Sequence, residues 1–155
     1  MNTRAIVIGV GNPYRRDDGF GPAVLAMLRR SCLSDVDLVE CDGEPSRLID
    51  LWDGAALAVV VDAVRALPAH PGRLHRLSAH HPAVARTAGA SSHGAGLGEA
   101  VDLARALDRL PRQLLLYAVE ADDVGFGVGL TPAVAHAAHA VAAEIAELVA
   151  AGVSC

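Results

Sequence analysis

The feature that most constrains the fold is the apolar run Ala5–Val10 (AIVIGV), which is followed by a glycine-containing loop. A continuous run of aliphatic and β-branched residues is typical of a strand that is buried on both faces of a parallel sheet. Beyond the loop, the apolar residues of Pro22–Arg30 keep helical spacing, and Arg29 and Arg30 lie where a helix C-terminus favours positive charge. The chain therefore begins with a strand, a loop and a helix.

The remaining sequence continues this alternation. Apolar patterns predict strands over residues 36–41, 56–63, 72–77 and 113–119, the third as an antiparallel edge strand, and helices over residues 45–52, 97–110 and 132–151. Thr131 is the expected N-cap of the last helix, and Gly152 is expected just past its end. This order predicts an α/β fold, a three-layer α/β/α sandwich around a mostly parallel but mixed, twisted sheet.

Composition narrows the class of function. The 155 residues are 52% hydrophobic but only 3% aromatic, so the core must be built from Ala, Val, Leu and Ile. We expect residues 1–155 to form a single domain, because a chain of this length buries about 70% of its unfolded surface. A net charge of -5 leaves no diffuse basic surface for a phosphate backbone, so nucleic acid is not an expected partner.

Cysteine usage and hydropathy indicate the compartment. Cys32, Cys41 and Cys155 are widely spaced and form no CxxC pair, which fits a reducing cytosol. We find no signal-peptide pattern and no apolar run approaching the roughly 20 residues of a membrane span. The expectation is a cytoplasmic protein without membrane contact. We also expect a monomer, because no apolar surface stripe remains once the core is assigned.

Polar residues gather where the predicted strands end. Asp17 and Asp18 follow the first strand, Asp62 closes the third, and His93 precedes a helix. Ligands of such sheets bind at the carboxyl ends of the strands, so these side chains are expected to share a cleft. Two carboxylates and an imidazole suit a divalent first-row metal and leave positions for substrate or water. Two acidic residues and a histidine at such positions also occur by chance, since the chain has 18 acidic residues and seven histidines.

The loop GNPYRRDDGFG, together with VVVDAV and SSHGAG, resembles the hydrogenase maturation peptidase family, whose first motif is GNxxxxDDGxG. That motif is matched by Gly11, Asn12, Asp17, Asp18, Gly19 and Gly21. A later family segment with a Gly-rich turn is echoed by Val119, Glu120, Gly125, Gly127, Leu130, Thr131 and Pro132. The resemblance spans nearly the whole chain and implies a phosphorylase/hydrolase-like form of the sandwich.

The resemblance implies a peptidase that removes the C-terminal extension of a hydrogenase large-subunit precursor, the expected partner. Nickel already inserted in that precursor would be the recognition signal. The family's metal ligands, which act on the scissile bond through the bound metal, carry over to Asp18, Asp62 and His93. Asp42 and Gly43 are expected to bind substrate, although many relatives continue DGGT where this chain has DGEPS. The expected supports of the loop are Gly11, Asn12, Asp17 and Gly19.

Ordinary structural roles also fit these residues. Asp17 can stabilise a helix N-terminus by about 0.3 to 1 kcal/mol, and we interpret it as a support rather than a ligand. Asp62 can cap a neighbouring loop, and His93 can be a surface histidine, as we expect of His70. Glu120 can orient the cleft or merely make a surface contact.

Three other functions share single features with this chain. Peptidyl-tRNA hydrolases resemble VGVGNP but continue towards a catalytic histidine, where this chain has RRDDGFG. A nucleotide-binding module would use the glycine loop, but Asp17 and Asp18 would repel a phosphate there. A metallochaperone would use the same three ligands to hold nickel without cleaving anything, and this alternative stays open.

Overall fold

The computed structural model describes residues 4–31, 33–79 and 94–153 of the chain. The elements follow the predicted order of strands and helices, with one short 3-10 helix added. In chain order they are β1 (Ala5–Val10), η1 (Arg16–Gly19), α1 (Phe20–Arg30), β2 (Val36–Cys41), α2 (Pro45–Trp52), β3 (Leu57–Val64), β4 (Leu74–Ser78), α4 (Gly94–Ala106), β5 (Gln113–Glu120) and α5 (Pro132–Val153).

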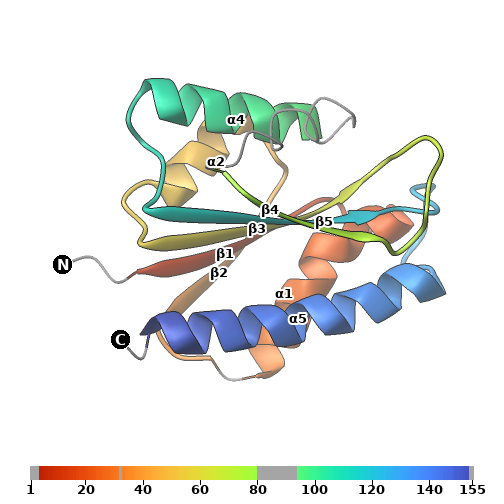
Figure 1. The fold of residues 1–155 in the computed structure, drawn as a ribbon. Helices are drawn as coiled ribbons and strands as arrows, with labels where there is room; N and C mark the ends of the chain where they lie inside the picture. Colours follow the sequence, from red (N-terminus) through yellow and green to blue (C-terminus); the bar gives the residue numbers. More distant parts are fainter. Residues whose placement is uncertain (1–3, 32, 80–93, 154–155) are drawn as a thin grey trace.

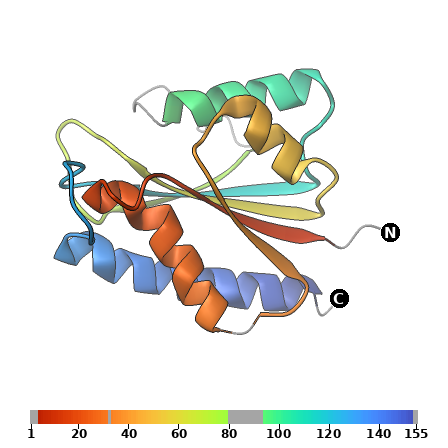
Figure 2. The same cartoon turned by 180° about the vertical axis from the view of Figure 1, so that it is seen from behind.

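The strands form one sheet in the order β2-β1-β3-β5-β4. Strands β2, β1, β3 and β5 are mutually parallel, whereas β4 pairs antiparallel with β5 at the edge. Helices α2 and α4 cover one face of the sheet, and α1 and α5 cover the other (Figures 1 and 2). The predicted three-layer sandwich with a mostly parallel, mixed sheet is confirmed.

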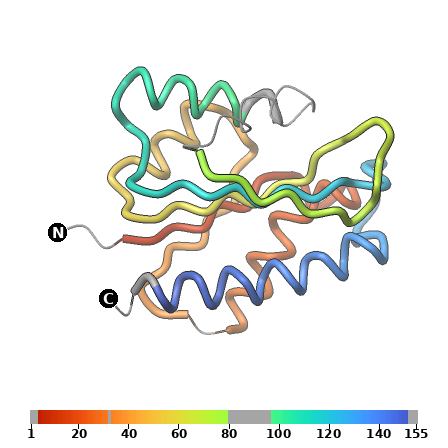
Figure 3. Tube along the Cα trace, viewed as in Figure 1, coloured from red at the N-terminus to blue at the C-terminus, as the bar shows by residue number. Residues whose placement is uncertain are grey.

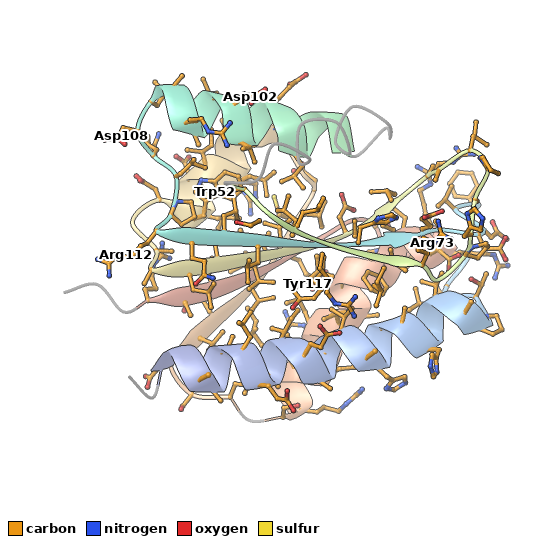
Figure 4. All side chains as sticks on the ribbon, in the orientation of Figure 1. Trp52, Arg73, Asp102, Asp108, Arg112 and Tyr117 are labelled. Carbon is orange, nitrogen blue, oxygen red and sulfur yellow. The ribbon has the colours of Figure 1, made fainter. Side chains whose placement is uncertain are left out.

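Each face of the sheet has its own apolar core. Side chains of β3 alternate between them: Val59 and Val61 pack towards α1 and α5, and Ala58 and Val60 pack towards α2 and α4. Figure 4 labels an aromatic residue of each core: Trp52, the last residue of α2, and Tyr117 of β5, which faces α5. By the same alternation, Asp62 lies on the α2 and α4 face of the sheet.

Several predicted boundaries are wrong. The helix predicted over residues 97–110 is α4, Gly94–Ala106, and the strand predicted over residues 72–77 is β4, Leu74–Ser78. The strand predicted over residues 56–63 is β3, Leu57–Val64, which ends one residue later than predicted because Val64 still pairs with Glu120 of β5. Helix α5 continues through Gly152 to Val153. A glycine costs a helix only about 1 kcal/mol relative to alanine, which is not enough to stop the last turn.

Helix α5 also corrects the expectation that no segment reaches the length of a membrane span. By length and composition alone, Pro132–Ala151 could cross a membrane. In this fold, however, one side of the helix is buried against α1 and the sheet. The buried residues on that side include Val134, Val141, Ile145 and Val149. Its apolar composition is thus used in the core.

Candidate active site

Two glycines let the first loop and helix approach the sheet closely. Gly11 has a φ of +133°, and a Cβ built on it would lie 1.9 Å from the carbonyl oxygen of Asp18. A Cβ on Gly21 would lie 2.5 Å from the amide nitrogen of Val10 and 2.8 Å from the carbonyl oxygen of Val61. Any side chain would therefore displace the loop or α1. The loop is held tightly over the carboxyl ends of β1 and β3.

Asp18 is buried in η1 at the end of this loop. Its Oδ2 accepts the backbone N–H of Asn12 at 2.9 Å, and Oδ1 of Asn12 accepts the backbone N–H of Tyr14 at 2.9 Å. These two bonds fold the loop back on itself. The Asp18 carboxylate is therefore positioned by the Gly-Asn pair that opens the motif.

Asp62 is the second buried acid at this end of the sheet. Its Oδ1 accepts the backbone N–H of Ala63 at 2.8 Å. Burial raises the pKa of Asp62 well above the ordinary value of 3.8, and the negative charge of Asp18 raises it further. The two carboxylates therefore lie close enough to repel each other, and a proton or a cation between them would relieve that repulsion.

The carboxylate of Asp17 binds the loop that follows β5. Its oxygens accept the backbone N–H groups of Asp122, Asp123 and Thr131 at 2.9, 3.0 and 2.7 Å, and the Thr131 hydroxyl donates at 2.8 Å. Burial on its own raises the pKa of Asp17, but these hydrogen bonds outweigh it and hold the pKa below 3.8. The Thr131 hydroxyl, expected to cap α5, is thus engaged by Asp17.

The backbones of the same two loops also pair. The N–H of Arg16 donates to the carbonyl of Gly127 at 2.9 Å, and the N–H of Gly127 donates to the carbonyl of Tyr14 at 2.9 Å. Asp17 adds a third bond, from its own N–H to the carbonyl of Asp123 at 2.9 Å. The loop after β1 and the loop after β5 therefore form one connected layer at the carboxyl end of the sheet.

The turn after β2 adjoins this layer. The N–H of Gly11 donates to the carbonyl of Cys41 at 3.2 Å, which places Asp42 and Gly43 beside the start of the first loop. Asp42 is exposed, and its Oδ1 accepts the backbone N–H of Glu44 at 3.0 Å. Glu44 and Pro45 depart from the DGGT pattern: Glu44 caps α2 by accepting two backbone N–H groups, and Pro45 is the first residue of that helix. The departure therefore has a local structural role.

A buried glutamate and a histidine lie on the neighbouring strands. Glu120 Oε2 is 2.8 Å from Nε2 of His75, and Oε1 accepts the backbone N–H of His70 at 2.8 Å. Burial raises the pKa of Glu120, but these bonds and the nearby positive charge outweigh it and lower the pKa below 4.5. In the strand register, Asp62 is opposite Ala118, and Ala118 is opposite His75. His75 thus lies two strands from Asp62, about 10 Å between Cα atoms.

The model of the hydrogenase maturation protease family matches residues 24–148. The chain belongs to this family. It is 36% identical over 136 residues to the hydrogenase expression/formation protein HupD of Thiocapsa roseopersicina, a match that covers 82% of this chain and 59% of HupD. The chain thus spans less than two thirds of the length of that relative.

Solved structures of the family share the fold. The hydrogenase maturating endopeptidase HybD of E. coli superposes with a TM-score of 0.79 at 21% identity, over 92% of this chain and 89% of HybD. The [NiFe] hydrogenase maturation protease HybD of Thermococcus kodakarensis superposes with a TM-score of 0.74 at 24% identity, over 94% and 98% of the two chains.

In this member of the hydrogenase maturation protease family, the structure brings Asp18 and Asp62 together, with Asp42 and Gly43 on the adjoining turn. Among the described residues no group of three acidic, histidine or cysteine side chains is close enough to hold a metal ion. His93, the third expected ligand, lies outside the described residues. It directly precedes α4, which covers the same face of the sheet as Asp62.

Sequence reasoning missed His75. The sequence places it in an alternating edge strand, where a histidine carries no special signal. Only the antiparallel register of β4 against β5 brings it to the buried carboxylate of Glu120. For Glu120 itself, the structure shows a buried hydrogen-bonded carboxylate rather than a surface contact.

Proposed function

We propose that this chain is an endopeptidase that removes the C-terminal extension of a nickel-containing hydrogenase large-subunit precursor. The observation that carries the proposal is the buried pair Asp18 and Asp62 at the carboxyl end of the sheet. The chain's membership of the hydrogenase maturation protease family supplies the reaction class. The E. coli HybD structure, which shares the fold, is that of a hydrogenase maturating endopeptidase.

The two acids suit a divalent cation delivered by the substrate. Carboxylate oxygens bind first-row divalent metals, and an imidazole such as His93 would add a nitrogen ligand. The raised pKa of Asp62 reflects burial and the repulsion from Asp18, and a dipositive ion would offset both effects. Nickel held there would sit beside the scissile bond, where a divalent metal ion polarises a carbonyl and lowers the pKa of bound water from 15.7 to about 7 in favourable sites.

Under this proposal, nickel is part of the substrate and serves as the recognition signal. A precursor without nickel would lack the group that Asp18, Asp62 and His93 bind, and its extension would not be positioned for cleavage. The exposed turn at Asp42 and Gly43 would contact the precursor next to this site. The cytoplasmic location and the monomeric state stay predictions.

Mass spectrometry of a large-subunit precursor from the same organism tests the proposal. The precursor would be prepared with and without nickel and incubated with the natural protein, Asp62→Asn or His93→Ala. We expect loss of one defined C-terminal peptide only when the natural protein meets the nickel-loaded precursor. Asp122→Asn, which changes an exposed acid on the loop after β5, is the matched control and should cleave normally.

Absence of cleavage by the natural protein, with nickel verified in the precursor, would contradict the proposal for that pairing. Tight retention of nickel by the isolated protein, again without cleavage, would favour the metallochaperone alternative. Equal cleavage of precursors with and without nickel would remove nickel from the recognition step while leaving the peptidase activity intact.

A further inference from the structure

The aromatic residues of this chain are divided between the core and one end of the sheet. The sequence holds only five, of which Phe20, Trp52 and Tyr117 are buried. The other two, Tyr14 and Phe126, are 69% and 90% exposed. Aromatic side chains are enriched at protein interfaces relative to the rest of the surface.

These two aromatic residues are neighbours although 112 positions separate them. The N–H of Gly127 donates to the carbonyl of Tyr14 at 2.9 Å, and Arg15 forms a parallel bridge with Gly127. Tyr14 and Phe126 each directly precede a residue of that bridge, so their backbones lie side by side. Val128, which follows the bridge, is 75% exposed.

A fourth exposed apolar side chain lies at the same end of the sheet. Leu67, on the loop between β3 and β4, is fully exposed. The N–H groups of His70 and Gly72 on that loop donate to Glu120 at 2.8 and 2.9 Å, which ties the loop to the end of β5. Figure 3 shows this yellow-green loop at the same end as the blue loop that precedes α5. We call Tyr14, Leu67, Phe126 and Val128 the rim patch.

The backbone under the rim patch is already ordered. Asp17 accepts three backbone N–H groups from the loop that carries Phe126, and the two loops share three backbone hydrogen bonds. A partner that binds here would not have to order these loops, which lowers the entropic cost of association. Preorganised aromatic side chains are the kind of residue that contributes most to binding energy at interfaces.

Location identifies the occupant. Tyr14 and the buried Asp18 belong to the same short loop, which closes on itself through Asn12. A folded partner whose chain reaches Asp18 and Asp62 must lie over the surface around that loop. The patch offers on the order of 500 Å² of apolar side chain, a large part of the roughly 800 Å² that each partner buries in a standard interface.

We infer that the rim patch binds an apolar surface on the folded part of the large-subunit precursor, next to the point where the C-terminal extension begins. This inference rests on the proposed function. Asp18 and Asp62 then act on the C-terminal extension of the precursor, while the rim patch binds its folded part. Contacts with the folded part of the precursor would supply binding affinity that contacts with a short extension cannot.

The test uses a double variant, Tyr14→Ser with Phe126→Ser, against a matched control, Leu103→Ser with Leu107→Ser. The control leucines are 44% and 53% exposed. They lie in and just after α4, where the chain turns back to the amino end of the sheet. We expect the rim double variant to raise KM for the nickel-loaded precursor by about tenfold or more, with kcat within about twofold. The control should match the natural protein, and circular dichroism should show both variants folded.

Capture of the precursor on immobilised protein, without any cleavage readout, separates this inference from the proposed function. Binding lost only in the rim double variant supports the docking surface, even if no precursor is cleaved. Unchanged KM and unchanged capture would overturn it. If size-exclusion chromatography shows a dimer that only the rim double variant dissociates, or anionic vesicles bind only the natural protein, with KM unchanged in either case, the patch serves that other occupant and the inference is wrong.

Discussion

Replacing Asp17 by alanine should destabilise the protein more than any other single change at an acidic residue of the site. The substitution removes the acceptor of three backbone N–H groups and one hydroxyl, all at 2.7 to 3.0 Å. A hydrogen bond to a charged group contributes about 1.5 to 3 kcal/mol. The contributions are not additive here, because the freed donors lie on a loop that water can reach. We expect a loss of about 3 to 5 kcal/mol in the free energy of unfolding, near the upper end for single substitutions.

Urea unfolding followed by circular dichroism at pH 7 measures this loss. Asp17→Asn keeps the shape and one acceptor oxygen but turns an amide towards backbone donors, so we expect about half of the effect. The control is Asp122→Ala, an exposed acid on the same loop, which should change stability by less than about 0.5 kcal/mol.

The pH dependence gives an independent check. Because the pKa of Asp17 is lower in the folded protein than its ordinary 3.8, the stabilisation is complete above that value and is lost as the pH falls through the folded pKa. The difference in the free energy of unfolding between the natural protein and Asp17→Ala should therefore stay constant from pH 7 to about 5 and become smaller below about pH 4. Equal stability of Asp17→Ala and Asp122→Ala would refute the reasoning, as would a difference that widens in acid.

Three further predictions concern the rest of the site. Asp62 has a raised pKa, so its ionisation destabilises the folded protein as the pH rises from 3.8 through the folded pKa. Without metal, Asp62→Asn should therefore be more stable to urea than the natural protein at pH 7, although it should lose precursor cleavage. A variant less stable than the natural protein would contradict this prediction. Gly21→Ala should cost about 1 to 3 kcal/mol in urea unfolding, since its Cβ would meet the backbone of two strands; a neutral effect would count against the close approach. Glu120→Gln should lower the free energy of unfolding by about 1.5 to 3 kcal/mol at pH 7. This difference from the natural protein should disappear in acid, because the pKa of Glu120 is lowered below 4.5. A difference independent of pH would show that the negative charge of Glu120 does not contribute to stability.

Helix and strand periodicity made the layers of this protein predictable. Ala5–Val10 and Gln113–Glu120 are nearly continuous apolar runs, as central strands of a parallel sheet must be when helices cover both faces. The edge position of β4 also followed from its alternating pattern. Some element boundaries were mispredicted, as at Gly152, because a glycine near the end of a helix does not by itself stop it.

The motif residues were recognisable from sequence, but their partners were not. Asp17 and Asp18 are adjacent in the sequence, but their side chains bind different parts of the protein. Asp18 bonds to Asn12 within its own loop, whereas Asp17 reaches Thr131, 114 positions away. Local spacing contains no information on such long-range hydrogen bonds, because they depend on which strands lie next to each other in the sheet.

What the sequence by itself determined is the family, the order of elements and the end of the sheet at which the acidic residues gather. These properties depend on local pattern and on the geometry common to parallel sheets. Only the tertiary structure decided that Asp17 joins two distant loops, that His75 meets Glu120, and that Tyr14 lies beside Phe126. Each of these pairs is created by the strand order β2-β1-β3-β5-β4, and that order is set by packing of the whole chain rather than by any segment of it.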